Sequence, residues 1–313
     1  MLSRTADSLY WMARYTERAE NIARLMEVSY RMSLQRHGAG GGYWGAALGI
    51  TGLEAAYNAR HGAISANAVL RFMGADFGNP SSILSCLKAA RENCHAVRGT
   101  VTSEVWETIN TTWLEARTSA AVLMQGDVSG SDLTKYFEWV KFRSHLSRGV
   151  TVGTMLQDQA FHFIRLGTFL ERADNTARLL DFKYDELAPQ ADAGSEYYEW
   201  GALLRSLSSF EIYRKVYRDV ITPNRVAELL ILRAGMPRSM LTCMKEVQQI
   251  LDLVANARSH ETQRLAGSLH SHLRYGRIDD ILAVGLHGYL TDFLSKTAEL
   301  GNGIAQDFLV PVA

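Results

Sequence analysis

The chain has 313 residues, a length that suits one large or two ordinary domains with a buried core. Its 33 Lys and Arg residues are balanced by 33 Asp and Glu residues. The resulting formal net charge of +0 argues against nucleic-acid binding, or attachment to an anionic membrane, as the main function.

The sequence also predicts a cytoplasmic protein that does not enter a membrane. Six charged residues within the first twenty leave no room for the apolar region of a signal peptide. The longest uncharged run, residues 37–53, is too short and too rich in glycine to span a bilayer. The cysteines Cys86, Cys94 and Cys243 form no CxxC pair, which is typical of reduced thiols and gives no zinc-binding pattern.

The first predicted element is a long helix. Residues 11–30 repeat apolar side chains with the 3.6-residue period of a helix, not with the alternation of a strand. The apolar side comprises Trp11, Met12, Tyr15, Ala19, Ile22, Met26 and Tyr30, and the opposite side carries Arg14, Glu17, Glu20, Asn21 and Arg24. Later stretches show the same period, and no β-hairpin or βαβ pattern is present, so we predict an all-α fold.

Turn-forming residues mark the ends of further helices. We expect loops at residues 36–43, around 126–131 and at 187–196. Asn79-Pro80 and Thr222-Pro223 each predict an N-cap followed by proline at the first helical position. Pro237 is expected to open another helix.

One charged peptide occurs twice in the chain. ERAENIARL at residues 17–25 returns as ERADNTARL at residues 171–179, with seven of nine positions identical. The apolar side of the helix is duplicated with it, since Met12, Tyr15 and Met26 match Leu166, Phe169 and Leu180 at the same offset of 154 residues. A chance match would not readily repeat both the polar side and the apolar side of the helix.

Further matches follow in the same order along the chain. YWGAAL (43–48) aligns with EWGALL (199–204), and NPSSILSCL (79–87) aligns with MPRSMLTCM (236–244). Trp44 with Trp200, and Tyr57 with Tyr213, are predicted to be equivalent core anchors. The last third of each half aligns weakly, with HLSR (145–148) and FLSK (293–296) as the tentative match.

We therefore predict an internally duplicated helical bundle. The repeats span residues 1–150 and 151–313, and we expect the two similar halves to pack as one compact unit with a pseudo-twofold relation.

The repeated charges admit more than one interpretation. Glu17, Asn21 and Arg24 form a line along the helix surface, as do Glu171, Asn175 and Arg178. Solvated intrahelical pairs would stabilise the helix by only ~0.3–0.5 kcal/mol each, so nothing would preserve them in both copies. Either the lines meet, with Glu17 pairing Arg178 and Glu171 pairing Arg24 across the twofold, or they line a cleft for a zwitterionic amino acid or peptide.

No recognised catalytic, metal-binding or cofactor-binding motif is present. HExxH, G-x-S-x-G, the Walker A motif and a glycine-rich dinucleotide loop are all absent. Glu92 and His95 form a single ExxH, whose counterpart in the second half is Gln249 to Asp252, so a di-iron site is incomplete. We expect no metal and no cofactor.

The sequence resembles the bacterial alpha-E family over essentially its whole length. The resemblance rests on MLSRTADSLYWMARYTERAENIARL at the start, RENCHAVRGTVTSEVWETIN in the middle and FIRLGTFLERADNTARLLDFKY at the second repeat. The charged positions of the family's motif correspond in this sequence to Glu17, Arg18, Asn21, Arg24, Glu171, Arg172, Asp174, Asn175 and Arg178. These residues are candidates for a binding site or a central charge network.

The resemblance also implies partners. Alpha-E proteins are typically encoded beside, or fused to, circularly permuted ATP-grasp proteins of the amidoligase type. Transglutaminase-like proteases, and in some bacteria a proteasome-like peptidase, share these neighbourhoods. This context implies a pathway that makes or trims small peptides.

Three hypotheses of function follow. The first is an accessory protein that partners an ATP-grasp amide ligase and binds its peptide ligand or the ligase. The second is an enzyme in which Glu17 or Glu171 acts as the general base of a peptide-forming or transfer step. The third is a purely structural scaffold.

Overall fold

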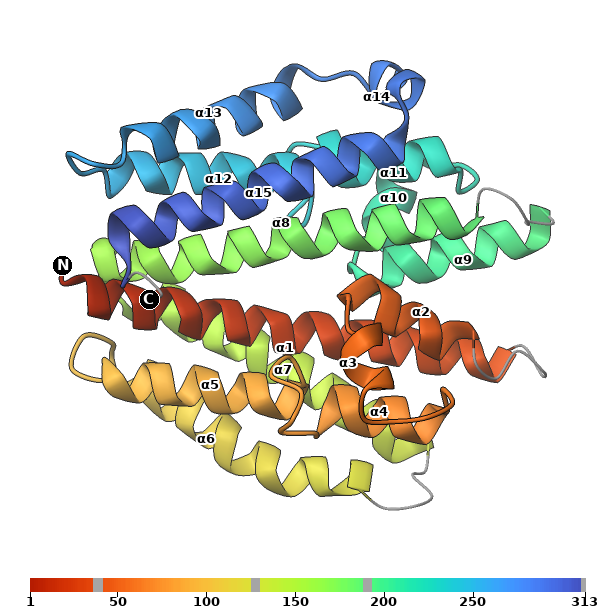
Figure 1. The fold of residues 1–313 in the computed structure, drawn as a ribbon, viewed down its shortest axis with the longest axis horizontal. Coiled ribbons are helices and arrows are strands. Elements are labelled where there is room, and N and C mark those ends of the chain that lie inside the picture. The colour runs from red at the N-terminus through yellow and green to blue at the C-terminus, as the bar shows by residue number, and fades with distance from the viewer. Residues whose placement is uncertain (36–41, 125–129, 188–192, 311–313) are drawn as a thin grey trace. The chain divides into compact units, whose positions relative to one another are not determined.

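A computed structural model of the chain describes residues 1–35, 42–124, 130–187 and 193–310. Every regular element within these ranges is a helix, which confirms the all-α prediction (Figure 1). None of the helices in these ranges combines the length and the apolar character that crossing a bilayer requires. The chain divides into two compact units, residues 8–164 and residues 1–7 with 165–313, here named the N-terminal and C-terminal units.

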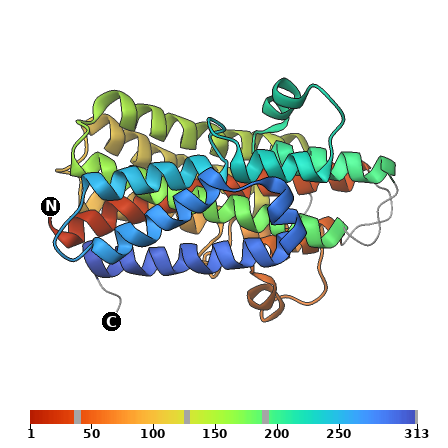
Figure 2. The same cartoon turned by 90° about the horizontal axis from the view of Figure 1, so that it is seen from above.

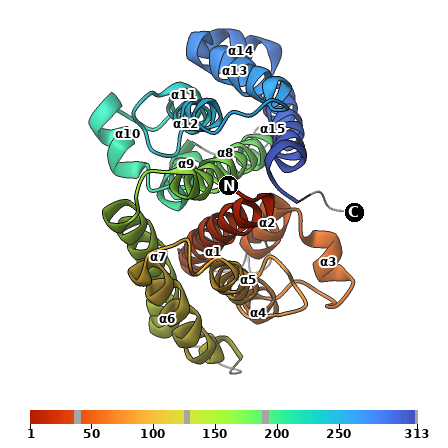
Figure 3. The ribbon, with the colours of Figure 1, turned by 90° about the vertical axis from the view of Figure 1, so that its left-hand side faces the viewer.

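The N-terminal unit is a bundle of long helices with short helices inserted after the first. Its elements are α1 (Ser3–Gln35, which begins in the C-terminal unit), α2 (Gly42–Thr51), α3 (Glu54–Asn58), α4 (Ala66–Gly74), α5 (Ile83–Ala96), α6 (Ser103–Ser119), the 3₁₀ helix η1 (Ala120–Met124) and α7 (Gly130–Thr154). α6 packs against both α5 and α7, and Figure 3 shows these helices close to end-on.

The C-terminal unit repeats this arrangement of long and short helices. Its elements are α8 (Gln159–Leu187, which begins in the N-terminal unit), α9 (Ala193–Ser206), α10 (Phe210–Tyr217), α11 (Pro223–Leu232), α12 (Met240–Leu253), α13 (His260–Tyr275), α14 (Ile278–Val284) and α15 (Leu286–Phe308). α13 packs against both α12 and α15, and these three helices run alongside one another in Figure 2.

Several details of the two units agree beyond the order of helices. α5 and α12 both have 14 residues and begin 157 residues apart. Their N-caps, Ser82 and Ser239, each accept a hydrogen bond 3.1 Å long from the backbone N–H three residues later. These agreements support the internal duplication, and the repeats 1–150 and 151–313 stay a prediction.

The prolines begin helices in only one of the three predicted places. Thr222 is the N-cap of α11 and Pro223 its first residue, as predicted. α5 and α12, however, begin three residues after Pro80 and Pro237, so these two predictions are wrong. Asn79 is used in a turn instead, because its Oδ1 accepts from the Ser81 N–H at 3.0 Å.

The predicted loops fall mainly outside the described residues, at 36–41, 125–129 and 188–192. Their described ends, 42–43, 130–131, 187 and 193–196, belong to helices, so the loops are shorter than predicted. The core anchors are confirmed: Trp44, Trp200, Tyr57 and Tyr213 are at most 2% exposed.

Candidate functional site

One face of α1 buries four charged side chains in succession. Glu17, Glu20, Arg24 and Glu27 follow a three-or-four-residue spacing, which places them on one side of the helix. Each is less than 9% exposed, and Glu20 is fully buried. Burying a charge is costly unless it is paired, so this face needs partners from a neighbouring helix.

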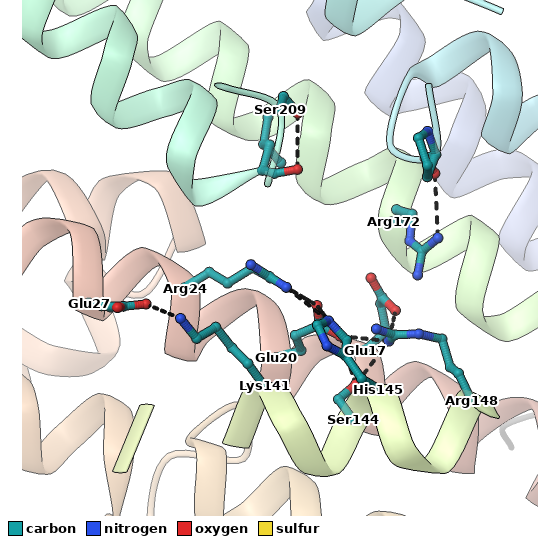
Figure 4. A network of polar contacts seen from close by, with 12 residues as sticks. Glu17, Glu20, Arg24, Glu27, Lys141, Ser144, His145, Arg148, Arg172 and Ser209 are labelled. Atoms are coloured by element: carbon teal, nitrogen blue, oxygen red, sulfur yellow. Dashed lines mark hydrogen bonds and ion pairs between the residues drawn. The ribbon is translucent and has the colours of Figure 1, made fainter. Parts of the chain in front are cut away.

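The partners come from α7, which is separated from α1 by more than 90 residues of chain. They are Lys141, Ser144, His145 and Arg148, and they share one face of α7 by the same spacing rule. Figure 4 shows these side chains meeting the carboxylates of α1. We name these eight residues the α1–α7 network.

Glu20 lies at the centre of the network. Its Oε1 accepts from Nε of Arg24 at 2.8 Å, and its Oε2 accepts from Nη1 of Arg148 at 2.6 Å. The hydroxyl of Ser144 donates to the same Oε2 at 2.7 Å. Two guanidinium groups and a hydroxyl therefore compensate the buried carboxylate.

Glu17 and Glu27 extend the network in the two directions along α1. Nη1 of Arg148 also donates to Oε2 of Glu17, at 2.9 Å, so this one nitrogen bridges two carboxylates. Glu27 accepts from Nζ of Lys141 with one oxygen and from Arg31, one turn along α1, with the other. Each of the three carboxylates thus has a cation as a hydrogen-bond donor.

His145 is the most solvent-exposed of the three α7 side chains that contact Glu17 or Glu20. Its Nε2 lies 3.1 Å from Nη2 of Arg24 and 3.4 Å from Oε1 of Glu20, while 54% of its side chain is exposed. An Nε2 without hydrogen can accept from Arg24 at this position, and an Nε2 that carries hydrogen can donate to Glu20. The tautomer of His145 therefore determines which of the two it bonds.

A small, mainly apolar cavity adjoins the network at Ser144. It has room for about one water molecule. Its lining comes from α1, α5, α6 and α7 and consists of Thr16, Leu87, Ala90, Ile109, Thr112, Arg143, Ser144 and Ser147. Arg143 is held there by Thr112, whose Oγ1 accepts from Nε at 2.8 Å.

The remaining predicted residues of the N-terminal unit lie beside this face. Asn21 is buried at 6% exposure. Arg18 is half-buried, and its guanidinium carbon lies 5.7 Å from the centre of the Tyr15 ring. The predicted Glu17–Arg178 and Glu171–Arg24 pairs would join the two units and stay a prediction.

The second copy of the motif has different surroundings. Glu171 and Arg172 are buried, and Nη1 of Arg172 donates to the Pro237 carbonyl oxygen at 3.4 Å. Asp174 and Arg178 form an i,i+4 pair at 2.8 Å, which is the counterpart of Glu20–Arg24 but is more exposed, at 25% for Asp174 and 46% for Arg178. Asn175 is half-buried.

The α15 helix does not repeat the polar face of α7. Leu133, Phe137, Val140 and Ser144 are buried on α7, and Leu286, Leu290, Phe293 and Thr297 are buried on α15, at a constant offset of 153 residues. The tentative HLSR–FLSK match, at an offset of 148, is therefore wrong in register. At the correct register, Lys141, Ser144, His145 and Arg148 correspond to Leu294, Thr297, Ala298 and Gly301. The two cations that α7 adds to the network, Lys141 and Arg148, thus have no cationic counterpart on α15.

Sequence reasoning missed every α7 member of the network, and it did not include Glu20 or Glu27 among the candidate site residues. It did place Glu17, Glu20 and Arg24 on one side of the first helix, because the helical period fixes that relation within one element. The available signal on α7 was the spacing of Lys141, Ser144 and Arg148, which places three polar side chains on one face. That spacing does not identify the helix that this face contacts.

Comparison with known proteins places the chain in a family. A family model described as a predicted alpha-helical domain with a conserved ER motif matches residues 1–309, and this chain has Glu-Arg pairs at 17–18 and 171–172. Uncharacterized proteins of Mycobacterium bovis and of two strains of Mycobacterium tuberculosis are each 25% identical to the chain.

The alignments with these relatives are 317 positions long and cover 93% of this chain but 35% of each relative. The chain therefore spans about a third of the length of the curated relatives that it matches. No solved structure matches the chain. Because the family model covers almost all of the sequence, the chain belongs to the Alpha-E family.

Proposed function

We propose that this Alpha-E protein is an accessory, non-catalytic partner of an ATP-grasp amide ligase. It would bind the peptide or amino-acid ligand of the ligase, or the ligase itself. In this scheme the ligase forms the acyl phosphate and the amide bond, while the Alpha-E protein holds a reactant or positions the enzyme.

The observation that carries the proposal is the pairing of the carboxylates in the α1–α7 network. A general base must take up a proton during the reaction, and an adjacent cation disfavours that uptake. Glu17 accepts from Arg148, and Glu20 accepts from Arg24 and Arg148. This arrangement suits a network that fixes α1 against α7 better than one that moves protons.

The space beside the network supports the same conclusion. The cavity next to Ser144 has room for about one water molecule, which is far smaller than an amino acid. A peptide therefore does not fit in this cavity, whereas Arg148 and His145 of the network are partly exposed and could contact a ligand.

The lengths of the relatives also favour a partner. In the three mycobacterial proteins, the region matched by this chain is about a third of a longer polypeptide. In those relatives, the matched region is covalently linked to additional polypeptide. The same region in this protein is therefore well suited to act together with a separate protein.

The test is reconstitution with the ATP-grasp protein from the same genome. We expect the isolated Alpha-E protein to produce no peptide from ATP and amino acids, and the ligase to form more product when the Alpha-E protein is added. Arg148→Ala should reduce this stimulation. Arg264→Ala, which removes an exposed pair with Glu261 in the C-terminal unit, should leave it unchanged.

Two other outcomes would contradict the proposal. Turnover by the isolated protein that is lost in Glu17→Gln would favour the hypothesis of an enzyme. Ligase activity that is the same with and without the Alpha-E protein, together with no binding between them, would favour a scaffold.

A further inference from the structure

A cluster of exposed cations lies on α10 and at the end of α9. α10 packs against α9 and α11, and Figure 3 shows it at the edge of the C-terminal unit. Residues 205–218 contain four cations but a single carboxylate, Glu211. The four cations are all exposed, and we name them the α10 cation cluster: Arg205, Arg214, Lys215 and Arg218.

The α10 cation cluster has no carboxylate partner within the part of the chain that the structure describes. None of its four members forms an ion pair there, whereas other exposed cations of the same unit do. Arg264 pairs with Glu261, and Lys296 pairs with Asp292. Neighbouring cations without counter-charges repel one another and create a positive surface, which favours an anionic partner.

The N-terminal unit shows that the shared fold does not require these cations. The fully buried Tyr57 and Tyr213 set the register of the two units at this point, with an offset of 156 residues. At this offset the counterparts of the cluster are all neutral: Gly49, Asn58, Ala59 and Gly62. The cations are therefore a feature of the C-terminal unit that the packing common to both units does not explain.

The three arginines of the cluster are arranged as a line along α10. Phe210, Arg214 and Arg218 follow one another at intervals of four residues, so they lie on one side of the helix. The guanidinium carbon of Arg205 lies 4.1 Å from the centre of the Phe210 ring, which places a third guanidinium at the first position of the line. A guanidinium that lies on an aromatic ring keeps its N–H edge available for a carboxylate.

Arg218 holds its place in the line at a conformational cost. It is the C-cap of α10 and has a left-handed backbone, with a φ of 52°. This region favours glycine, because the Cβ of any other residue crowds the following carbonyl oxygen. The backbone therefore gives no reason for an arginine at this position, and what its side chain binds can give one.

We infer that the α10 cation cluster binds an extended acidic segment of a partner protein. Side chains four residues apart on a helix are separated by about 6 Å, which sets the interval between the guanidinium groups. In an extended peptide, every second side chain points in the same direction at intervals of about 7 Å. Carboxylates at alternate positions of the segment therefore meet Arg205, Arg214 and Arg218 in turn, and Lys215 lies beside this line.

The exposure of the cluster favours a segment of a larger protein over a free peptide. An exposed ion pair contributes little free energy, so three such pairs alone bind weakly. A segment that is joined to a second contact gains a high effective concentration and binds more tightly. In the mycobacterial relatives the region matched by this chain is joined to further polypeptide, which is the situation that this arrangement suits.

The composition of α10 does not suit a membrane surface. A helix that lies on a bilayer exposes large apolar side chains next to its cations. The large apolar and aromatic side chains of α10 are all buried or half-buried: Phe210, Ile212, Tyr213, Val216 and Tyr217.

Binding of a labelled peptide to the full chain tests this inference. The probe is fluorescein-labelled Gly-Glu-Gly-Glu-Gly-Glu-Gly, and the readout is fluorescence anisotropy. At an ionic strength of about 0.02 M we expect a Kd between about 0.1 mM and about 1 mM. Raising the ionic strength to about 0.5 M should weaken binding at least about tenfold, because salt screens exposed charges. The same peptide with glutamine in place of glutamate should not bind.

A pair of double variants separates the cluster from general charge. Arg214→Gln with Arg218→Gln removes two of the three guanidinium groups and should weaken binding about three- to tenfold. Arg264→Gln with Lys296→Gln removes two exposed cations of the same unit that are already paired. This matched control changes the net charge equally and should leave the Kd within about twofold of wild type.

Arg218→Gly provides a variant that keeps the fold intact. Glycine suits the left-handed backbone, so the midpoint of thermal unfolding should not fall, while peptide binding should weaken about threefold. Weaker binding together with unchanged or greater stability assigns the effect to the lost side chain.

Three results would overturn the inference. These are no binding at about 1 mM protein and low ionic strength, equal weakening by the two double variants, and equal or tighter binding of a DNA oligonucleotide of the same charge. Because no ligase is present in these measurements, their failure is distinct from failure of the proposed function.

Discussion

Nη1 of Arg148 lies 2.6 Å from Oε2 of Glu20, although 128 residues separate the two in the chain. Glu20 is fully buried, and Arg148 reaches it from α7, so the pair joins the first long helix of the N-terminal unit to the last. A buried carboxylate that loses its cations is strongly destabilising, whereas the intact pair contributes little net free energy. We expect this contact to fix the register of α1 on α7.

Neutralising the central carboxylate should destabilise the protein. Glu20→Gln keeps the size of the side chain but leaves Arg24 and Arg148 without its charge, so we expect a loss of about 3–5 kcal/mol in the free energy of unfolding. Asp174→Asn, in the corresponding but more exposed pair with Arg178, should cost less than about 1 kcal/mol. Urea unfolding followed by circular dichroism measures both, and equal losses would contradict the difference in burial.

Removing both charges of the pair should cost less than the sum of the single changes. Glu20→Gln with Arg148→Gln restores the charge balance, so we expect a coupling of about 1–3 kcal/mol in a double-mutant cycle. The comparison cycle uses Glu261→Gln and Arg264→Gln, an exposed pair for which the coupling should be below about 1 kcal/mol. Additive losses for Glu20 and Arg148 would show that the contact is not energetically coupled.

The serine N-caps of α5 and α12 should both contribute to stability. Ser82→Ala and Ser239→Ala each leave a helix N–H without its acceptor, at an expected cost of about 0.5–2 kcal/mol. Ser239→Ala should cost more, because this hydroxyl also donates to the Arg233 carbonyl oxygen at 2.8 Å. Ser295→Ala, at an exposed position of α15, is the control and should stay within about 0.5 kcal/mol of wild type.

His270 should make stability depend on pH. Burial, and then the nearby Arg274 and Lys245, lower the pKa of His270 in the folded protein. The ordinary pKa of a histidine side chain, about 6.5, applies in the unfolded chain. Just below that pH the unfolded chain binds more protons than the folded protein does, so the free energy of unfolding falls as pH decreases through that value. His270→Asn should flatten this part of the profile, measured as the free energy of unfolding against pH. An unchanged slope in His270→Asn would contradict the assignment.

The three cysteines should be unreactive in the folded protein. Cys86, Cys94 and Cys243 are buried thiols, and burial raises the pKa of Cys94 to about 12. Because the thiolate is the reactive form, a thiol-specific reagent should label none of them before denaturation and all three after it. Ser295→Cys provides an exposed thiol as the positive control. Rapid labelling of one native cysteine would show that its helix opens locally.

Periodicity predicted the helical character of the chain, because each helix reports its own apolar side through residues three and four apart. The prolines were less informative. Pro80 and Pro237 lie in turns before α5 and α12, and serine hydroxyls three residues before Ser85 and Thr242 provide the caps. A proline indicates that its position is not in the interior of a helix. It does not show whether that position is the first residue of the helix or part of the turn before it.

The sequence by itself determined the all-α fold, the repeated Glu-Arg peptide and the placement of Glu17, Glu20 and Arg24 on one side of the first helix. These features depend on residues that are near one another in the chain, where the geometry of the helix fixes the distances. Only the tertiary structure decided that Lys141, Ser144, His145 and Arg148 complete the network and that α15 provides no equivalent cations. Contacts between helices depend on which faces pack together, and the spacing of residues within one helix does not specify its partner.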